Sequence, residues 1–281
     1  MSKTTTDAIA NWNAEDPAFW QSHKGVAVRT LLISMLSLHL AFAVWFTWSA
    51  LVVRLPNTGF HLSVEQRFWL PAMALLMGAV ARFPHTFLVL KIGGRNTTLI
   101  TNLLLVVPII GIGQVVKDPT TPYAVLLFWA AVAGLAAGGQ ISSSSANISL
   151  WFPRRLAGTA LGVNIGVGNL GTSVAQFVVP AVVGSALFGA MAGGPQVFVK
   201  GSVSTDIWLQ NGAYVWEITV VVATLLVWLG MKNHPARGGF VEQFRVLKKK
   251  HTWITTILYT MTFGTFSGMA GAFPSLIKEV F

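Results

Sequence analysis

One arginine stands out as a residue that could do chemistry. Arg82 lies inside a hydrophobic stretch that runs from Phe68 to Leu90 and is followed by Lys91. At the rise of an α-helix, Arg82 lies about 13 Å from Lys91, which is too deep for its side chain to reach water easily. The long apolar segments carry no aspartate or glutamate near mid-depth. A lone buried cation needs a counter-charge, so we predict that Arg82 binds an anionic solute.

Two other interpretations of this region stay open. Backbone carbonyls, or serine and asparagine side chains, would also satisfy a structural Arg82. His85 follows three residues later and is expected on the same helix face. It could carry a proton that moves with the solute, or it could be a neutral hydrogen-bonding histidine.

Composition indicates a membrane protein. The chain has 281 residues, of which 53% are hydrophobic and 10% charged, against about 25% charged in a typical soluble domain. The net charge of +10 could indicate nucleic-acid binding, but the basic residues fall in short connections between apolar segments, as membrane topology requires. The chain has no cysteine, no nucleotide-binding loop and no metalloprotease or hydrolase motif. We therefore expect no enzyme activity, cofactor, metal site or nucleic-acid partner.

Seven apolar segments are long enough to cross a bilayer as helices. They span residues 26–53, 68–90, 97–116, 122–151, 156–190, 212–231 and 253–276. Most of the 19 lysine and arginine residues lie in connections on the side of the amino terminus, which predicts a cytoplasmic amino terminus. The first residues lack the apolar core of a cleavable signal peptide, so we expect insertion through the first span.

Spacing predicts how the chain is divided. Residues 1–25 form a cytoplasmic amino-terminal segment, 26–231 a six-helix transmembrane lobe, 232–252 a basic cytoplasmic linker, and 253–281 the first helix of an incomplete second lobe. Many transporters pair two such halves and hold their solute between them. The expected fold is therefore an all-α polytopic membrane protein, with one six-helix lobe and one further transmembrane helix.

The fifth predicted span carries small residues at helical spacing, namely Gly158, Gly162, Gly166, Gly168, Asn169 and Gly171. At about 100° per residue, Asn169 falls on the stripe of the first three glycines. Such a stripe lets another helix approach closely, and Asn169 could serve either the solute or the helix contact. Tyr259 and Phe263 lie one turn apart on the last span. Such a pair of rings usually packs against a neighbouring helix, and it could also border a planar anion.

Several segments, taken together, resemble the nitrate/nitrite porter family of the major facilitator superfamily over nearly the whole chain. They are NWNAEDPAFWQSHKG, LHLAFAVWFTWSALVV, GAVARFPHTFLVLKIGGRNTT, GGQISSSSANISLWFP and GTALGVNIGVGNLGTSVAQFVVP. The resemblance implies a secondary transporter of nitrate and/or nitrite in a bacterial-type inner membrane. It also implies anion exchange by alternating access, a role in nitrate assimilation, and no cofactor.

The resemblance assigns roles to individual residues. Arg82 matches the arginine of the second helix that grips the substrate, and its planar guanidinium suits a planar oxyanion. Asn169 matches the polar residue of the nitrate signature. Its small neighbours are Gly158, Gly162, Gly166, Gly168 and Gly171. Tyr259 and Phe263 match the aromatic pair of the seventh helix, which borders the anion.

The chain also departs from the family pattern. Ile141 stands where some members have a phenylalanine that closes the pocket, and His85 stands where tyrosine is common. The family's second arginine and second signature lie in a carboxyl half that this sequence does not contain. Two alternatives to anion exchange therefore remain. One is proton-coupled uptake, with His85 or a residue of the other half carrying the proton. The other is a non-transporting fragment, or a half that needs a second chain. The expected partners are nitrate, nitrite, the lipid bilayer and a second half or chain that completes the transporter.

Overall fold

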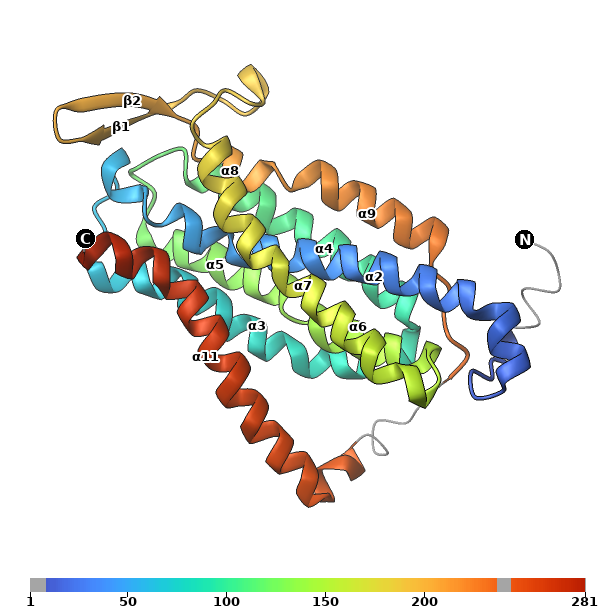
Figure 1. Cartoon of the computed structure of the whole chain (residues 1–281). Helices are drawn as coiled ribbons and strands as arrows, with labels where there is room; N and C mark the ends of the chain where they lie inside the picture. The colour runs from blue at the N-terminus through green and yellow to red at the C-terminus, as the bar shows by residue number, and fades with distance from the viewer. Residues whose placement is uncertain (1–8, 237–243, 281) are drawn as a thin grey trace.

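The computed structural model describes residues 9–236 and 244–280, which form a long helical bundle with a β-hairpin at one end (Figure 1). The helices are α2 (Pro17–Leu51), α3 (Val64–Ile92), α4 (Gly94–Val115), α5 (Tyr123–Ala137), α6 (Gln140–Trp151), α7 (Arg154–Val182), α8 (Asn211–Tyr214), α9 (Glu217–Gly230) and α11 (Lys250–Val280). Three 3-10 turns lie between them, η1 (Leu55–Thr58), η2 (Gly189–Met191) and η3 (Arg245–Lys248). The strands are β1 (Gln196–Lys200) and β2 (Val203–Ile207).

Among the described residues, six helical segments are long and apolar enough to cross a membrane. They are Pro17–Leu51, Val64–Ile92, Gly94–Val115, Tyr123–Trp151, Arg154–Val182 and Asn211–Gly230. They correspond to the first six predicted spans, so the expectation of an all-α polytopic membrane protein is confirmed. The seventh predicted span is a helix, α11, but threonine and glycine dilute its apolar residues and it is not among the six.

Local chemistry explains where the helix ends differ from the predicted ones. The first helix begins at Pro17 because the Asp16 carboxylate caps it, accepting a 2.9 Å hydrogen bond from the Ala18 N–H. The fifth span ends at Val182, well before residue 190, and a turn follows in which the Ser185 N–H donates to the Val182 carbonyl. The predicted outer connection 191–211 contains the antiparallel hairpin of β1 and β2, which the sequence analysis did not predict.

The fourth span is one predicted helix that the structure divides into α5 and α6. The division falls at Gly138 and Gly139, which pack closely against α3. A Cβ on Gly138 would lie 2.2 Å from the Gly78 Cα, and one on Gly139 would lie 1.9 Å from the His85 Nδ1. The two glycines are therefore required by close helix packing.

The core is built around α2, which packs against α7, α9, α3, α5 and α6. Its largest fully buried side chains include Trp48 and Phe42. Buried polar groups join the same helices: the Ser34 and Ser144 hydroxyls lie 2.8 Å apart, and the Asn164 Nδ2 donates to the Ser144 Oγ over 2.6 Å. Together these contacts fix the lobe that carries Arg82.

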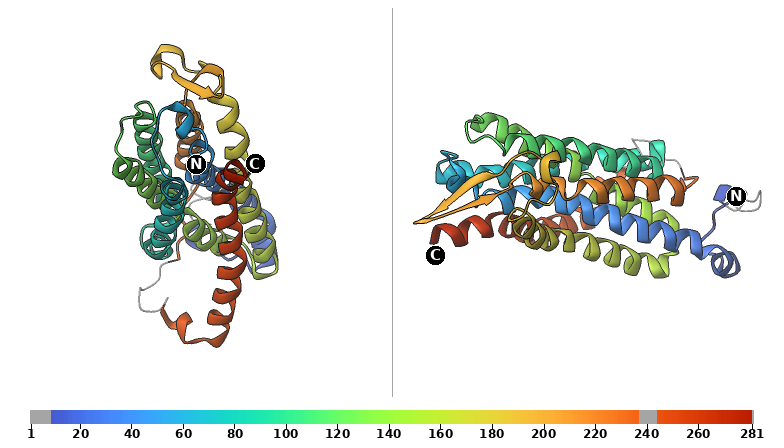
Figure 2. Two further views of the ribbon diagram at one scale, coloured as in Figure 1. Left: turned by 90° about the vertical axis from the view of Figure 1, so that its left-hand side faces the viewer. Right: turned by 90° about the horizontal axis from the view of Figure 1, so that it is seen from above.

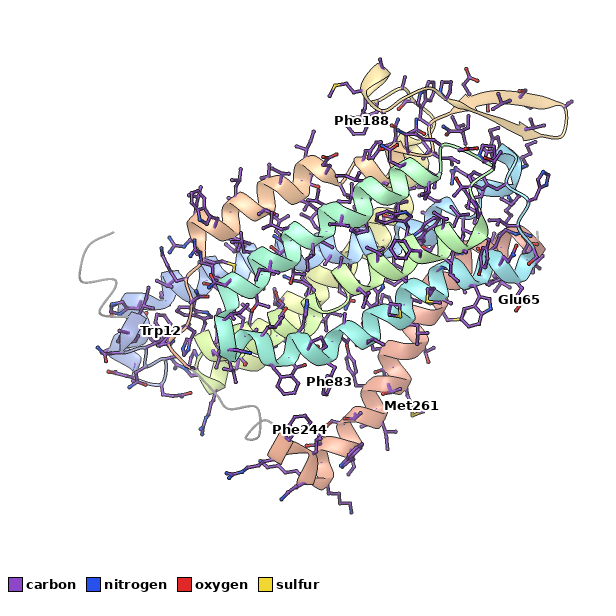
Figure 3. All side chains as sticks on the ribbon, turned by 180° about the vertical axis from the view of Figure 1, so that it is seen from behind. Trp12, Glu65, Phe83, Phe188, Phe244 and Met261 are labelled. Carbon is purple, nitrogen blue, oxygen red and sulfur yellow. The ribbon has the colours of Figure 1, made fainter. Side chains whose placement is uncertain are left out.

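α11 packs against α3 and α2 at its carboxyl end and diverges from the bundle toward its amino end (Figures 1 and 2). The carboxyl end is held by an ion pair between Arg67 and Glu279, and Lys278 Nζ donates to Asn57 Oδ1 over 2.8 Å. Near the amino end, the Phe244 ring lies 6.3 Å from that of Phe83 on α3 (Figure 3). These contacts leave a space beside α3 in which the candidate site lies.

Candidate functional site

Arg82 projects from α3 into a cavity of about 220 Å³ between α2, α3 and α11. The lining residues are Trp45, Leu75, Ala79, Arg82, Tyr259, Thr260, Phe263, Gly264 and Ser267. A capping box at the start of α3, between Ser63 and Gln66, sets the register of this helix. Arg82 is thus carried by a rigid helix and is half-buried.

Three aromatic rings surround the guanidinium of Arg82. Its central carbon lies 4.6 Å from the ring centroid of Phe263, 5.8 Å from that of Trp45 and 6.0 Å from that of Tyr259. The Tyr259 and Phe263 rings stack at 5.1 Å with planes 5° apart. Each cation–π contact contributes about 0.5–2 kcal/mol. The rings hold the charge in place without neutralising it.

Arg82 has no carboxylate partner within residues 9–236 and 244–280. Its Nε–H is buried and makes no hydrogen bond to any described residue. A buried charged donor without a partner is costly, whereas an anion in the cavity could accept from it. The geometry of the described part therefore suits a small anion beside Arg82. No cluster of metal-ligating side chains occurs among the same residues.

Asn169 does not line this cavity. It lies half-buried on α7, and its Oδ1 has no hydrogen-bond partner in the described part of the chain. The structure thus brings together three of the four predicted binding residues, Arg82, Tyr259 and Phe263. A direct role of Asn169 toward the same solute remains a prediction.

The glycines of α7 are divided between two faces, so they are not one packing seam. Gly168 and Gly171 face α2, where a Cβ would lie 2.5 Å from Leu38 Cγ and 2.0 Å from the His39 carbonyl oxygen, respectively. The other three, Gly158, Gly162 and Gly166, face space in which no described atom lies within 4 Å of an added Cβ. The difference follows from the helical repeat, because Gly168 and Gly171 are rotated away from the first stripe.

His85 lies apart from the cavity although it is only three residues from Arg82. Its ring is buried against Gly139 at the start of α6. The two side chains thus contact different neighbours in this arrangement, and a proton-carrying role of His85 stays a prediction. Ile141 is likewise buried in the core and outside the cavity lining.

Among the lining residues that the sequence analysis missed, Trp45 contributes a ring next to the Arg82 guanidinium. Its indole N–H donates to the Ala74 carbonyl over 2.7 Å, so the ring presents carbon atoms to the cavity. The ring fits against Gly78, where a Cβ would lie only 2.3 Å from it. A glycine one turn before Arg82 was the available signal, because it marks a place where another element comes close.

Comparison with known proteins identifies curated relatives. No family model matches the chain. It is 47% identical over 274 residues to the probable nitrate/nitrite antiporter NarK2 of Thermus thermophilus, covering 97% of this chain and 61% of the relative. It is 38% identical over 283 residues to the nitrate/nitrite transporter NarU of Escherichia coli, covering 99% and 60%.

The chain spans about three fifths of the length of these curated relatives. NarU of Salmonella typhimurium matches to a similar extent, with 39% identity over 97% of this chain and 59% of the relative. The apolar helices and these relatives together indicate a multi-pass bacterial membrane protein. In its sequence and its helical architecture, this chain is similar to curated nitrate/nitrite transporters and antiporters, which belong to the nitrate/nitrite porter family of the major facilitator superfamily.

Proposed function

We propose that this chain binds nitrate or nitrite at Arg82 and forms one wall of a pathway that exchanges the two anions across a bacterial inner membrane. The observation that carries the proposal is the half-buried Arg82, which faces a cavity of about 220 Å³ and has no carboxylate partner in the described chain. The relatives named nitrate/nitrite transporters and antiporters support the choice of solute.

The aromatic walls favour a flat anion. The stacked Tyr259 and Phe263 rings lie 6.0 and 4.6 Å from the central guanidinium carbon of Arg82, so flat aromatic surfaces border the charge. Nitrate and nitrite are planar and can accept two parallel hydrogen bonds from the N–H groups of one guanidinium. A tetrahedral anion such as phosphate would meet the rings and would also bring more charge to desolvate. Shape and charge therefore both favour a planar monoanion.

Exchange follows from the same uncompensated charge. When the cavity is empty, closing it would bury Arg82 without a counter-ion, which costs free energy. When an anion is bound, the buried pair is neutral and closing is easier. A site that switches between the two sides of the membrane only when an anion is bound carries one anion in for each anion that it carries out. The separation of His85 from the cavity favours exchange over coupling through that residue.

Further parts of the pathway are proposed from the open surface of α7. Gly158, Gly162 and Gly166 offer a smooth helix face that no described residue covers. We place a second half or chain against this face and Asn169 at its edge, where its amide would meet the solute. The excess of basic residues in the connections on the amino-terminal side supports a cytoplasmic amino terminus, with residues 232–252, part of which lies outside the described residues, as the proposed inner linker.

Isothermal titration of the purified chain in detergent tests the choice of solute. We expect saturable binding of nitrate and nitrite, with mutual competition because both use Arg82. Chloride and phosphate should compete poorly, since neither is a planar anion with two acceptors for one guanidinium. Absence of saturable nitrate binding, or equal competition by phosphate, would overturn the proposal.

A further inference from the structure

A second cavity lies far from Arg82, on the face formed by α4 and α9. Its volume is about 550 Å³. The walls are the apolar side chains of Ile110 on α4 and of Ile218, Val221 and Val222 on α9, and Phe188 closes the hairpin end (Figure 3). Among the described residues, α11 packs mainly against α3 and α2, and neither helix lines this groove. The α4 and α9 side chains of these walls are exposed in the chain, and they lie on segments that are long and apolar enough to cross a membrane.

The hairpin end of the groove is polar. Tyr214 and Glu217 line it, and the Gln114 Nε2 donates to the Tyr214 hydroxyl over 2.9 Å. Lys117 lies beside them, with its Nζ 5.4 Å from the Tyr214 ring centroid and 3.2 Å from Gln114 Oε1. The groove is therefore apolar along its length and carries one cation and one carboxylate near its end.

The Glu217 carboxylate has neither a hydrogen-bond partner nor an ion-pair partner among the described residues, although its side chain is half-buried. It stands in the first turn of α9, where the helix dipole favours a negative charge. The Lys117 ammonium donates to Gln114 and keeps further donors available. Both charges can therefore take an external partner of opposite sign.

We propose that this groove binds a phospholipid with an ethanolamine headgroup. The acyl chain would lie along Ile110, Ile218 and Val221. It would cover the apolar surface of these side chains, which would otherwise contact the headgroup region. The phosphate would meet Lys117, and the ammonium would donate hydrogen bonds to Glu217. This assignment concerns a site separate from the one proposed for the transported anion.

The charge pattern separates this lipid from others. A choline headgroup is positive but has no N–H to donate to Glu217, so it forms a weaker contact. A glycerol headgroup has no positive charge and leaves the lipid anionic, so Glu217 would repel it. The ethanolamine headgroup matches both charges at once.

Native mass spectrometry of the full chain in detergent tests the assignment, with dioleoyl phosphatidylethanolamine, phosphatidylcholine and phosphatidylglycerol as probes. We expect one retained ethanolamine lipid, preferred roughly tenfold over the other two, as one charge-assisted hydrogen bond predicts. Glu217→Gln should remove the preference. Val221→Trp, which fills the groove from its exposed side, should remove binding. Asp206→Asn, on the hairpin at the same end, should change neither.

Equal retention of the three lipids would overturn the proposal. A preference that survives both Glu217→Gln and Val221→Trp would do so as well, because the lipid would then sit elsewhere. The groove would instead be a contact between copies of the chain if the wild-type protein were a dimer that Val221→Trp dissociates, and this result would also reject the lipid assignment.

Discussion

Arg82 combines three properties that rarely occur together in a membrane protein. It is a permanent charge, it is half-buried beside three aromatic rings, and it lacks a carboxylate partner in the described chain. The sequence predicted its depth and its lack of acidic neighbours from spacing alone. It did not identify Trp45, because Gly78 indicates that another element comes close but not which residue of α2 fills the space. Helix spacing likewise does not show that His85 packs against Gly139, because this contact depends on how α3 meets the start of α6.

The aromatic rings around the Arg82 guanidinium should each contribute to the affinity for nitrate. Phe263→Leu removes the ring closest to the guanidinium and its stack on Tyr259. We expect nitrate binding to weaken by about 0.5–2 kcal/mol, because Arg82 loses a contact that orients it. Calorimetric titration measures the change.

Phe273→Leu is the matched control, since Phe273 lies on the same helix but does not line the cavity. If Phe263→Leu bound nitrate as tightly as the Phe273→Leu protein, the rings would have no part in holding the anion.

Helix packing explains why the glycines of α7 differ although the sequence treats them alike. Gly168 and Gly171 let α7 cross α2 with the backbones close together, whereas Gly158, Gly162 and Gly166 meet no described atom. The helical repeat already separates the two sets. The sequence alone does not show which set faces α2, because that depends on how the whole lobe packs. The break between α5 and α6 has the same origin, in the approach of α3.

Substitutions in the two sets of α7 glycines should differ in their effect on the free energy of unfolding. In Gly171→Ala the new Cβ would lie 2.0 Å from the His39 carbonyl oxygen, a backbone atom that cannot move alone. We expect a loss of about 1–3 kcal/mol in the free energy of unfolding, as overpacking typically costs. Thermal unfolding in detergent, followed by tryptophan fluorescence, reports the change.

Gly162→Ala provides the comparison on the same helix. Nothing described lies within 4 Å of its added Cβ, so alanine should be neutral or stabilising by up to about 1 kcal/mol through helix propensity. Equal destabilisation by both substitutions would show that the open face is covered in solution.

At the scale of the whole molecule, the described helices form a lobe with one exposed small-residue face and one attached helix, α11. α11 is held at its carboxyl end by Arg67, Glu279 and Lys278, and its amino end stands away from the bundle. The sequence predicted the six spans of the lobe, because apolar length is a strong signal. The β-hairpin escaped prediction, since its short exposed strands carry no buried pattern.

The open face predicts little transport by the chain alone. One lobe provides one wall of a pathway, and a wall without its counterpart cannot alternate access. In liposomes loaded with nitrite, uptake of ¹⁵N-nitrate by this chain should be small beside that of the Thermus thermophilus relative named as an antiporter. Rapid uptake that Arg82→Lys abolishes would contradict this expectation, because the chain would then form a complete pathway.

The central claim is that the Arg82 guanidinium itself grips the planar anion. Isotope-edited infrared spectroscopy of bound ¹⁵N-nitrate tests it most directly, because two parallel hydrogen bonds on one side of nitrate split its asymmetric stretching band. The wild-type chain and Arg155→Lys, a substitution at an exposed arginine of α7, should both show the split band. Arg82→Lys should change the size of the splitting and weaken binding by about 1.5–3 kcal/mol, since a point charge cannot replace the fork. An Arg82→Lys protein that binds nitrate with wild-type affinity and the same split band would contradict the account.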